Sequence, residues 1–243
     1  MPAEKPFRRN CSNASSFVDL NETSYQEPAR HGSFFSNNYN TYPYINQIPE
    51  MFHPYIRNVQ DVRGDGNCGF RAIAVHLGLH EDAWPTIRSN LMEELEAYKT
   101  EYLNIFGRQY WNTVYNILNF FQSDRGAPVE HWMTMPEIGT LIASRYNVML
   151  HVIDIAGCST YLPLRSTPPP WYQHVIFAIG YVNGNHYIKL DLAEGYPIPR
   201  ITQHFRHCSY PCAAAWASPY LSRINKYEQL LRVSVTTDNV ILE

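Results

Sequence analysis

The chain has 243 residues, of which 45% are hydrophobic, 14% aromatic and 17% charged, and its formal net charge is -3 at pH 7. This length and composition indicate one large folded domain and exclude both a disulfide-stapled miniprotein and a chain that is disordered throughout. A net charge near zero gives no broad positive field, so we expect neither nucleic acid nor an anionic membrane surface as a partner.

The N-terminal residues Met1 to Asn10 are polar, and no stretch reaches the roughly 18 apolar residues of a membrane helix. We therefore expect an intracellular protein, cytoplasmic or nuclear, whose five cysteines are reduced thiols. Glycosylation is not expected in such a compartment. The unused sequons are those at Asn10, Asn13 and Asn21.

Three segments are predicted along the chain. Residues 1–45 are rich in Asn, Ser and Tyr and have no hydrophobic period, which is typical of a flexible arm. From Ile45 the density of aromatic and aliphatic residues rises. We expect one domain over residues 46–232 and a C-terminal tail at residues 233–243.

Apolar residues at helical spacing predict a first helix after Asp65-Gly66-Asn67, with Gly78 as its end. A second helix is predicted from about Asp82, which is a suitable N-cap. Its charged face is expected to point to solvent. That face consists of Glu93, Glu94 and Glu96.

A third helix is indicated from Trp111 to Leu118 by its apolar spacing. A fourth helix is predicted to begin at Thr134-Met135-Pro136-Glu137, which has the form of a capping box. A last helix is expected at about Ala213–Leu231, with an early break at Pro219.

Between the fourth helix and the last one, the sequence pattern changes to that of strands. Nearly continuous apolar runs predict central strands, and Asn183-Gly184 is a hairpin-turn dipeptide that leads into an alternating strand. The predicted strands are Val148–Ile155, Thr160–Leu164, His174–Tyr181 and His186–Leu192.

The run Asp65-Gly66-Asn67-Cys68-Gly69-Phe70-Arg71 places a thiol in the first turn of a helix. Unpaired N–H groups and the positive end of the helix dipole stabilise a thiolate there, and the same N–H groups can hold an oxyanion. Gly66 and Gly69 carry no side chains that would block a substrate from the sulfur. The alternative is a turn, a cap and a small buried cysteine, which is the commoner arrangement for an arbitrary cysteine.

This run resembles the cysteine box of the ovarian-tumour (OTU) family of cysteine proteases, and Gly184-Asn185-His186-Tyr187 resembles its histidine box. The resemblance covers about Ile56 to Leu192 and includes the stretch Trp132 to Tyr146 between the boxes. Three further segments are similar to the branch of OTU-like domains associated with transposable elements. They are Val62, Trp132-Met133-Thr134 and Pro197-Ile198-Pro199.

The resemblance implies an α+β, papain-like OTU fold, with helices packed around a mostly antiparallel central sheet and the active site between the Cys68 helix and the His186 strand. It further implies a thiol-dependent deubiquitinase, in which Cys68 is the nucleophile, His186 the general base and Asp65 the acidic member of the cysteine box. The implied reaction hydrolyses isopeptide bonds at the C-terminal glycine of ubiquitin through an acyl-enzyme, without a metal or cofactor. Ubiquitin or polyubiquitin is the implied partner. The oxyanion or substrate channel would be formed by Gly66, Asn67 and Gly69.

One position departs from the family pattern. Two residues after the histidine, where the family carries Asp or Asn to orient the imidazole, this chain has Ile188. Asp191 is a poor substitute, because five residues along a strand is about 16 Å and ends on the opposite face. Asn185, by adjacency, and Asp65, through the folded loop, are better candidates. A catalytically weak or inactive ubiquitin-binding module and a protease for another ubiquitin-like modifier therefore remain as alternatives.

Several other residues invite functional interpretations. One crowded cluster suggests zinc, but structural zinc sites usually combine two separated pairs, so an ordinary surface loop is the preferred interpretation. Arg71 is expected to pair with an acid rather than with substrate. Trp132 and Tyr187 either flank the active-site groove or belong to the core. The zinc cluster is His204, His207, Cys208 and Cys212, and the histidines expected to be structural are His76, His80, His151 and His174.

Overall fold

In the computed structural model the described residues are 42–122 and 124–240, with side chains described up to Arg232. The predicted sequons and residues 1–41 of the predicted arm lie outside this range. Within it, the helices are α1 (Cys68–His76), α2 (Trp84–Ala97), α3 (Lys99–Leu118), α4 (Glu137–Tyr146), α5 (Gln203–Cys208) and α6 (Leu221–Val240). Short 3-10 segments are η2 (Ile45–Gln47), η3 (Glu50–Tyr55), η4 (Glu81–Ala83), η5 (Val129–His131), η6 (Trp171–Gln173) and η7 (Pro211–Tyr220).

The strands form one sheet in the order β1-β5-β4-β2-β3. All neighbouring pairs are antiparallel except β2 and β4, which are parallel, so the predicted α+β class with a mostly antiparallel sheet is confirmed. The strands are β1 (Ile56–Gln60), β2 (Met149–Asp154), β3 (Ser159–Tyr161), β4 (Ile176–Val182) and β5 (His186–Leu192).

The edge strand β1 is not predicted by the sequence analysis. Three of its residues are exposed and polar, and its pairing with β5 is irregular between Ile56 and Asn58. Edge strands that face solvent on most positions lack the apolar alternation by which a strand is recognised. Its hydrogen bonds to β5 nevertheless determine where the segment after Gln60 lies.

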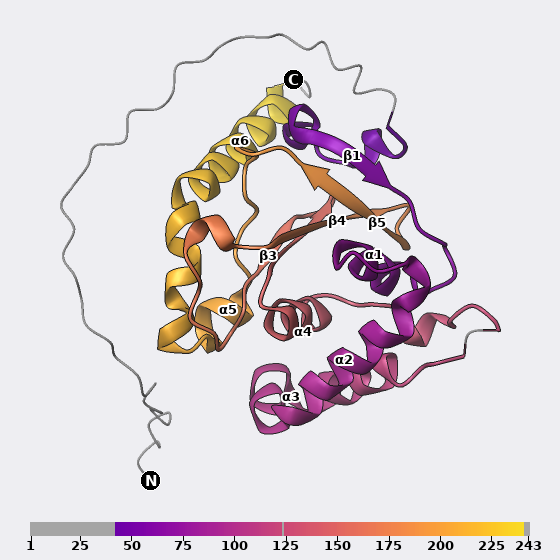
Figure 1. The fold of residues 1–243 in the computed structure, drawn as a ribbon. Helices are drawn as coiled ribbons and strands as arrows, with labels where there is room; N and C mark the ends of the chain where they lie inside the picture. The colour runs from indigo at the N-terminus through magenta and orange to yellow at the C-terminus, as the bar shows by residue number, and fades with distance from the viewer. Residues whose placement is uncertain (1–41, 123, 241–243) are drawn as a thin grey trace. The chain divides into compact units, whose positions relative to one another are not determined.

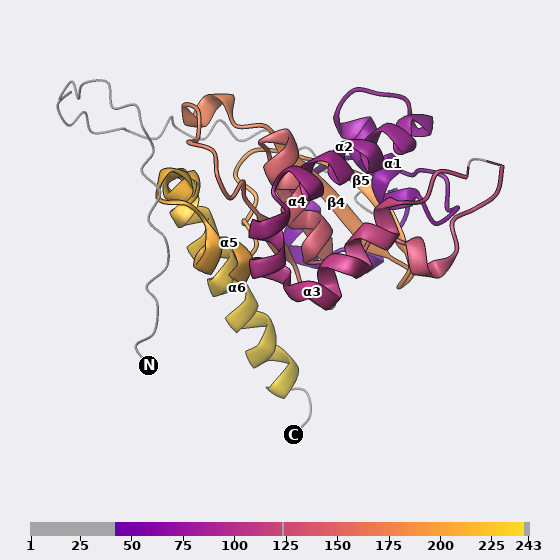
Figure 2. The same cartoon turned by 90° about the horizontal axis from the view of Figure 1, so that it is seen from below.

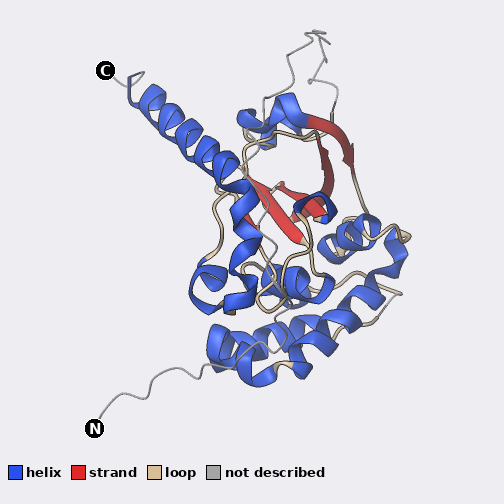
Figure 3. Cartoon of the chain, turned by 60° about the vertical axis from the view of Figure 1, so that its left-hand side comes forward, coloured by secondary structure: helices blue, strands red, loops and turns tan. Residues whose placement is uncertain are grey.

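Helices cover the sheet in layers (Figure 1). α1 packs on β5 and β4, α4 packs on β2 and β3, and α2 and α3 form an outer layer on these helices. Figure 2 shows α2, α3 and α4 on the same side of the sheet. The opposite face of the sheet carries Ile48, which approaches Gly180 and Ile188. Figure 3 shows the strands at the centre of the described fold with helices on both sides.

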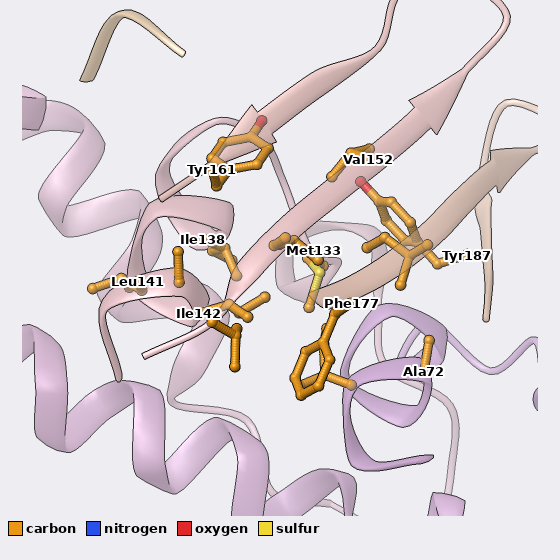
Figure 4. Packing of buried hydrophobic residues seen from close by; sticks show 14 of the residues in the cluster. Ala72, Met133, Ile138, Leu141, Ile142, Val152, Tyr161, Phe177 and Tyr187 are labelled. Atoms are coloured by element: carbon orange, nitrogen blue, oxygen red, sulfur yellow. The ribbon is translucent and has the colours of Figure 1, made fainter. Parts of the chain in front are cut away.

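The core between the sheet and α4 consists of aliphatic and aromatic side chains that the periodicity places on one face of each element. Ile138, Leu141 and Ile142 of α4 are completely buried, and Figure 4 shows Ile138 and Ile142 on the side of Met133 and Phe177. Burial of such side chains contributes about 1.5–3 kcal/mol each. In the part of the chain that the structure describes, no helix has the length and apolar character needed to cross a membrane.

The second helix, α2, begins at Trp84, later than predicted, and the face predicted to point to solvent includes a buried residue. Its N-cap is Ala83, without a capping side chain, because the Asp82 carboxylate accepts a hydrogen bond from Arg71 instead. Glu94 does not face water. It is buried, where it accepts hydrogen bonds from Tyr102 and Arg165. Glu94, which was predicted to face solvent, is thus covered by Arg165, a residue distant in the sequence.

Two further helix predictions are corrected. α3 starts at Lys99, well before Trp111, and bends at Gly107, whose φ of 77° is left-handed. The predicted capping box at Thr134 is wrong, because α4 starts at Glu137 with Pro136 in the N-cap position and no capping side chain. Towards the C-terminus, the helix predicted at about Ala213–Leu231 is divided into the 3-10 segment η7 and α6. α6 runs to Val240 and so includes residues 233–240 of the predicted tail, and α5 was not predicted at all.

Candidate active site

The loop before α1 is shaped by Asp65 and Gly66. Asp65 Oδ1 accepts a hydrogen bond of 3.0 Å from the backbone N–H of Asn67, which closes a tight turn. Gly66 has a φ of +80°, and a Cβ there would lie 2.4 Å from the carbonyl oxygen of Ala127. Only glycine meets both conditions. This turn leads directly into α1, whose first residue is Cys68.

Asp65 is also bound by Arg71, one turn further into α1. Arg71 Nη2 lies 2.6 Å from Asp65 Oδ2, and Nε lies 3.1 Å from Oδ1, which makes a bidentate ion pair. Burial raises the pKa of Asp65, but the bond from Arg71 and the N–H of Asn67 outweigh burial and hold this pKa below its ordinary value. The predicted pairing of Arg71 with an acid is confirmed. Asp65 therefore fixes the loop and does not contact the imidazole.

Asn67 is completely buried and lies outside the pocket that exposes the thiol. Its side-chain oxygen accepts bonds from Nη2 and Nε of Arg88 at 2.8 and 3.2 Å. The guanidinium of Arg88 is itself buried, and it lies 3.9 Å from the centre of the Phe70 ring. The backbone N–H of Asn67 is also taken by Asp65, and its Nδ2 is buried without a hydrogen-bond partner. The bonds that Asn67 does make therefore hold the loop in place.

The other predicted channel residues divide between pocket and core. Gly66 lines the pocket, whereas Gly69 packs against Met133, and a Cβ at Gly69 would lie 2.6 Å from the methionine sulfur. A side chain at Gly69 would thus collide with Met133, so the close packing of α1 on the segment before α4 accounts for this glycine. The first intrahelical bond of α1 runs from Arg71 N to Asn67 O, so the N–H of Cys68 is outside the helical ladder.

The histidine of the second motif lies beside this thiol. His186 is the first residue of β5 and is buried, and the N–H of its neighbour Tyr187 donates to Cys68 Sγ at 3.4 Å. The two predicted catalytic side chains, separated widely in the sequence, are therefore brought together by the packing of α1 on β5.

The acid that contacts His186 is Asp61, which the sequence analysis missed. His186 Nε2 lies 2.7 Å from Asp61 Oδ1, which leaves Nδ1 as the ring nitrogen for the thiol of Cys68. Asp61 directly follows β1, in which Gln60 pairs with Lys189. Continuing this antiparallel register by one residue sets Asp61 beside Ile188.

This arrangement explains the departure at Ile188. The isoleucine is completely buried and lies close to Gly180 on the sheet face that carries Ile48, so it belongs to the core. The carboxylate that contacts His186 comes instead from Asp61, which directly follows the neighbouring strand β1. Asn185, the other candidate for this role, is exposed at the rim of the pocket.

Asp61 is held by three donors. Oδ1 also accepts a bond of 2.8 Å from the N–H of Val62, and Oδ2 accepts one of 3.1 Å from the hydroxyl of Tyr44. Burial raises the pKa of Asp61, but the bonds from His186, Tyr44 and Val62 together lower it below its ordinary value. The group is therefore an ionised acceptor at neutral pH.

The environment favours a protonated imidazole. The hydrogen bond with Cys68 is the largest cause that raises the pKa of His186, burial opposes it, and Asp61 raises it further, to about 9. An imidazolium next to a thiol stabilises the thiolate. The arrangement can thus hold a thiolate–imidazolium pair with an orienting carboxylate behind it.

A pocket of about 270 Å³ opens onto this group. Trp132 forms part of its wall and donates from Nε1 to Ala127 O at 2.8 Å, whereas Tyr187 is buried against Tyr181 in the core. The lining residues are Tyr44, Asp61, Val62, Gly64, Gly66, Cys68, Trp132, Asn183, Asn185 and His186.

The crowded His/Cys cluster near α5 does not converge. His204 bonds to Thr140, His207 bonds to Gln203, and Cys212 donates to the carbonyl of Arg165. Over the described ranges, no three His, Cys, Asp or Glu side chains are grouped to hold a metal ion. Cys68, Cys158 and Cys208 are free thiols.

The remaining histidines have structural partners. His151 is buried against Thr160, and His174 bonds to Tyr220. His76, at the end of α1, bonds to the carbonyl of Ala178 at 2.8 Å. Burial lowers the pKa of His76 to about 4, so it is neutral rather than a cation at the helix end. His80 is exposed after α1 and accepts a bond from the N–H of Asp82.

Comparisons with known proteins give matches among solved structures. A scan of protein-family models finds no match, and a search of curated proteins finds no significant relative. The chain is similar in structure to the viral OTU domain protease of Farallon virus, with 19% identity, a TM-score of 0.40 and coverage of 58% of this chain and 87% of the other. It is also similar to the viral OTU domain protease of Dera Ghazi Khan virus, with 13% identity, a TM-score of 0.39 and coverage of 59% and 85%. A third similar structure is the Hazara virus OTU bound to ubiquitin, with 13% identity, a TM-score of 0.39 and coverage of 58% and 84%.

Proposed function

We propose that the protein is a cysteine-type deubiquitinase in which Cys68 is the nucleophile, His186 the general base and Asp61 the residue that orients His186. The observation that carries the proposal is the position of His186, which has the thiol of Cys68 on one side and Asp61 Oδ1 2.7 Å from Nε2 on the other. The resemblance of the sequence to the OTU cysteine and histidine boxes supports ubiquitin as the modifier. The assignment to the transposon-associated branch stays a prediction.

The reaction begins with proton transfer from Cys68 to His186, which the raised pKa of His186, about 9, favours. The thiolate attacks the carbonyl carbon of the ubiquitin C-terminal glycine. The backbone N–H of Cys68, outside the helical ladder of α1, is placed to donate to the oxyanion that forms. His186 then protonates the leaving lysine amine, and an acyl-enzyme remains.

In the second half of the reaction, water attacks the thioester and His186 accepts its proton. The carboxylate of ubiquitin leaves, and the thiolate is restored. Asp61 keeps the imidazole in place and stabilises its protonated form through both steps, as the acid of a catalytic triad does. This division of labour assigns Asp65 and Asn67 to holding the loop, since Arg71 binds the Asp65 carboxylate and Arg88 binds the side-chain oxygen of Asn67.

Hydrolysis of a ubiquitin conjugate tests the proposal. Wild type should release a fluorogenic amine from the ubiquitin C-terminus and cleave an isopeptide-linked diubiquitin. The matched control is Cys158→Ala, since Cys158 is also buried but donates to the carbonyl of Asp154, away from the pocket. Cys68→Ala should be inactive with an unchanged melting temperature, and Cys158→Ala should be active. A Cys68→Ala variant that still cleaves, or a folded wild type with no activity on any ubiquitin conjugate, overturns the proposal.

A further inference from the structure

We propose that the segment Tyr44–Gln47, which precedes the first strand, completes the catalytic site. In this proposal Tyr44 is a positioning residue for the Asp61 carboxylate, and Gln47 is a positioning residue for the turn that carries His186. The inference rests on the proposed function, since it concerns the same thiol and imidazole. The segment includes Tyr44 and Ile45, the last two residues of the predicted arm, 1–45.

Tyr44 determines which oxygen of Asp61 faces His186. Its hydroxyl donates to Asp61 Oδ2 at 3.1 Å, while Oδ1 meets His186 Nε2 at 2.7 Å. Its ring centre is 6.3 Å from that of His186, and it lines the same pocket as the thiol. The Asp61 side chain is 47% exposed and follows an edge strand, so little packing restrains its rotation. The Tyr44 hydroxyl on Oδ2 supplies that restraint together with the Val62 N–H on Oδ1.

The backbone of Tyr44 supports a specific placement. Its φ of 63° is in the left-handed region, which a bulky residue rarely adopts. Among the described residues, the other non-glycine positions with positive φ are Asn147 and Asn183, and asparagine tolerates this conformation. A tyrosine persists in it only where surrounding contacts determine the conformation. Those contacts here are the bonds of the segment to the catalytic elements.

Gln47 fixes the second element that holds His186. Its Nε2 donates to Asn183 Oδ1 at 2.9 Å, and its Oε1 accepts from the N–H of Asn183 at 2.6 Å. Asn183 opens the turn between β4 and β5, and His186 follows three residues later at the start of β5. The segment therefore bridges the end of β1, which supplies Asp61, and the hairpin, which supplies His186.

Tyr42 offers a matched control just before this segment. Its hydroxyl donates to the backbone carbonyl of Arg57 on β1 at 2.7 Å, and not to Asp61. Tyr42→Phe and Tyr44→Phe each remove one hydroxyl that donates a hydrogen bond. Only Tyr44→Phe removes a hydrogen bond to the carboxylate of Asp61.

The test is the pH dependence of alkylation of Cys68 by iodoacetamide, from pH 4 to pH 9, in the full chain, together with kcat and KM on ubiquitin amide. With Asp61 less well placed, the imidazolium is stabilised less and the thiolate forms at a higher pH. Tyr44→Phe should raise the pH of half-maximal alkylation and lower the rate on the acid side about two- to fivefold, as expected for one hydrogen bond. Gln47→Ala should shift the profile in the same direction. Tyr42→Phe should match wild type.

A double mutant separates positioning through Asp61 from a general structural effect. In an Asp61→Ala background, Tyr44→Phe should have no further effect on the alkylation profile, because the side-chain acceptor of its hydroxyl is absent. An equal loss in both backgrounds, or a Tyr44→Phe profile equal to that of wild type, overturns the role of Tyr44. A Gln47→Ala profile equal to that of wild type overturns the role of the turn contact. Because alkylation needs no ubiquitin, it judges this inference even if the hydrolysis assay rejects the proposed substrate.

Discussion

Replacing Asp61 by Asn removes the negative charge behind His186 while keeping a side chain of the same size. The structure gives His186 Nε2 a 2.7 Å bond to Asp61 Oδ1, and hydrogen bonds to charged groups contribute about 1.5–3 kcal/mol. Because the Asp61 side chain is 47% exposed, solvent screening places the effect at the lower end, about 1.5–2 kcal/mol. That corresponds to a loss of roughly 10- to 30-fold in kcat/KM.

The assay is kcat/KM on a fluorogenic ubiquitin amide as a function of pH. Cys68 is the largest cause of the raised pKa of His186, about 9, and Asp61 raises this pKa further. Asp61→Asn therefore lowers the pKa of His186, and the alkaline limb of the profile moves to lower pH. The control is Asp191→Asn, since Asp191 bonds to Asn58 and Lys189 and not to His186. Full activity with an unmoved alkaline limb in Asp61→Asn would refute the assignment of Asp61.

Three other predictions follow from the same structure. Ile188→Asn installs a residue type that the OTU pattern has at this position. Because the Ile188 side chain is completely buried in the core, this change should lower the free energy of unfolding by about 2–4 kcal/mol without raising activity. Denaturant unfolding and turnover, measured on the same variant, test both expectations. Gly66 and Gly78 both have positive φ, but only at Gly66 does a Cβ collide with the backbone. Gly78→Ala is expected to cost about 1–2 kcal/mol of stability, and Gly66→Ala should destabilise the protein far more. Equal melting temperatures for the two variants contradict this. The free energy of unfolding should fall as the pH drops from about 6.5 towards 4, because the unfolded state protonates His76 while the fold keeps it neutral, with a pKa of about 4. His76→Gln should flatten this dependence in denaturant titrations at pH 7 and pH 4.5, and an unchanged slope argues against it.

The hydrophobic pattern predicted the parts of the fold that depend on local spacing. The buried stripes of α1 and α4 and the strands from Met149 to Leu192 follow from residues within one element, and burial confirms them. The strand β1 has no such pattern, because three of its five residues are polar and exposed. It is defined by its pairing with β5, which is a contact between distant segments.

The same distinction separates the site residues that could be predicted from those that could not. Cys68 and His186 lie in recognisable local motifs. Asp61 has no motif of its own, and its contact with His186 spans 125 residues through the β1–β5 pairing. Glu94 was assigned to solvent by helix periodicity, yet it is covered by Arg165, which is 71 residues away. Long-range polar contacts of this kind have no signature in a single sequence.

The central claim is that Cys68 is the nucleophile of a protease for ubiquitin conjugates. It is tested most directly with a ubiquitin whose C-terminus carries a thiol-reactive electrophile, incubated with wild type, Cys68→Ala and His186→Ala, with the covalent adduct measured by mass spectrometry. We expect a single adduct on Cys68 in wild type, none in Cys68→Ala, and strongly slowed formation in His186→Ala. An adduct that persists in Cys68→Ala, or the absence of any adduct with folded wild type, would contradict the claim.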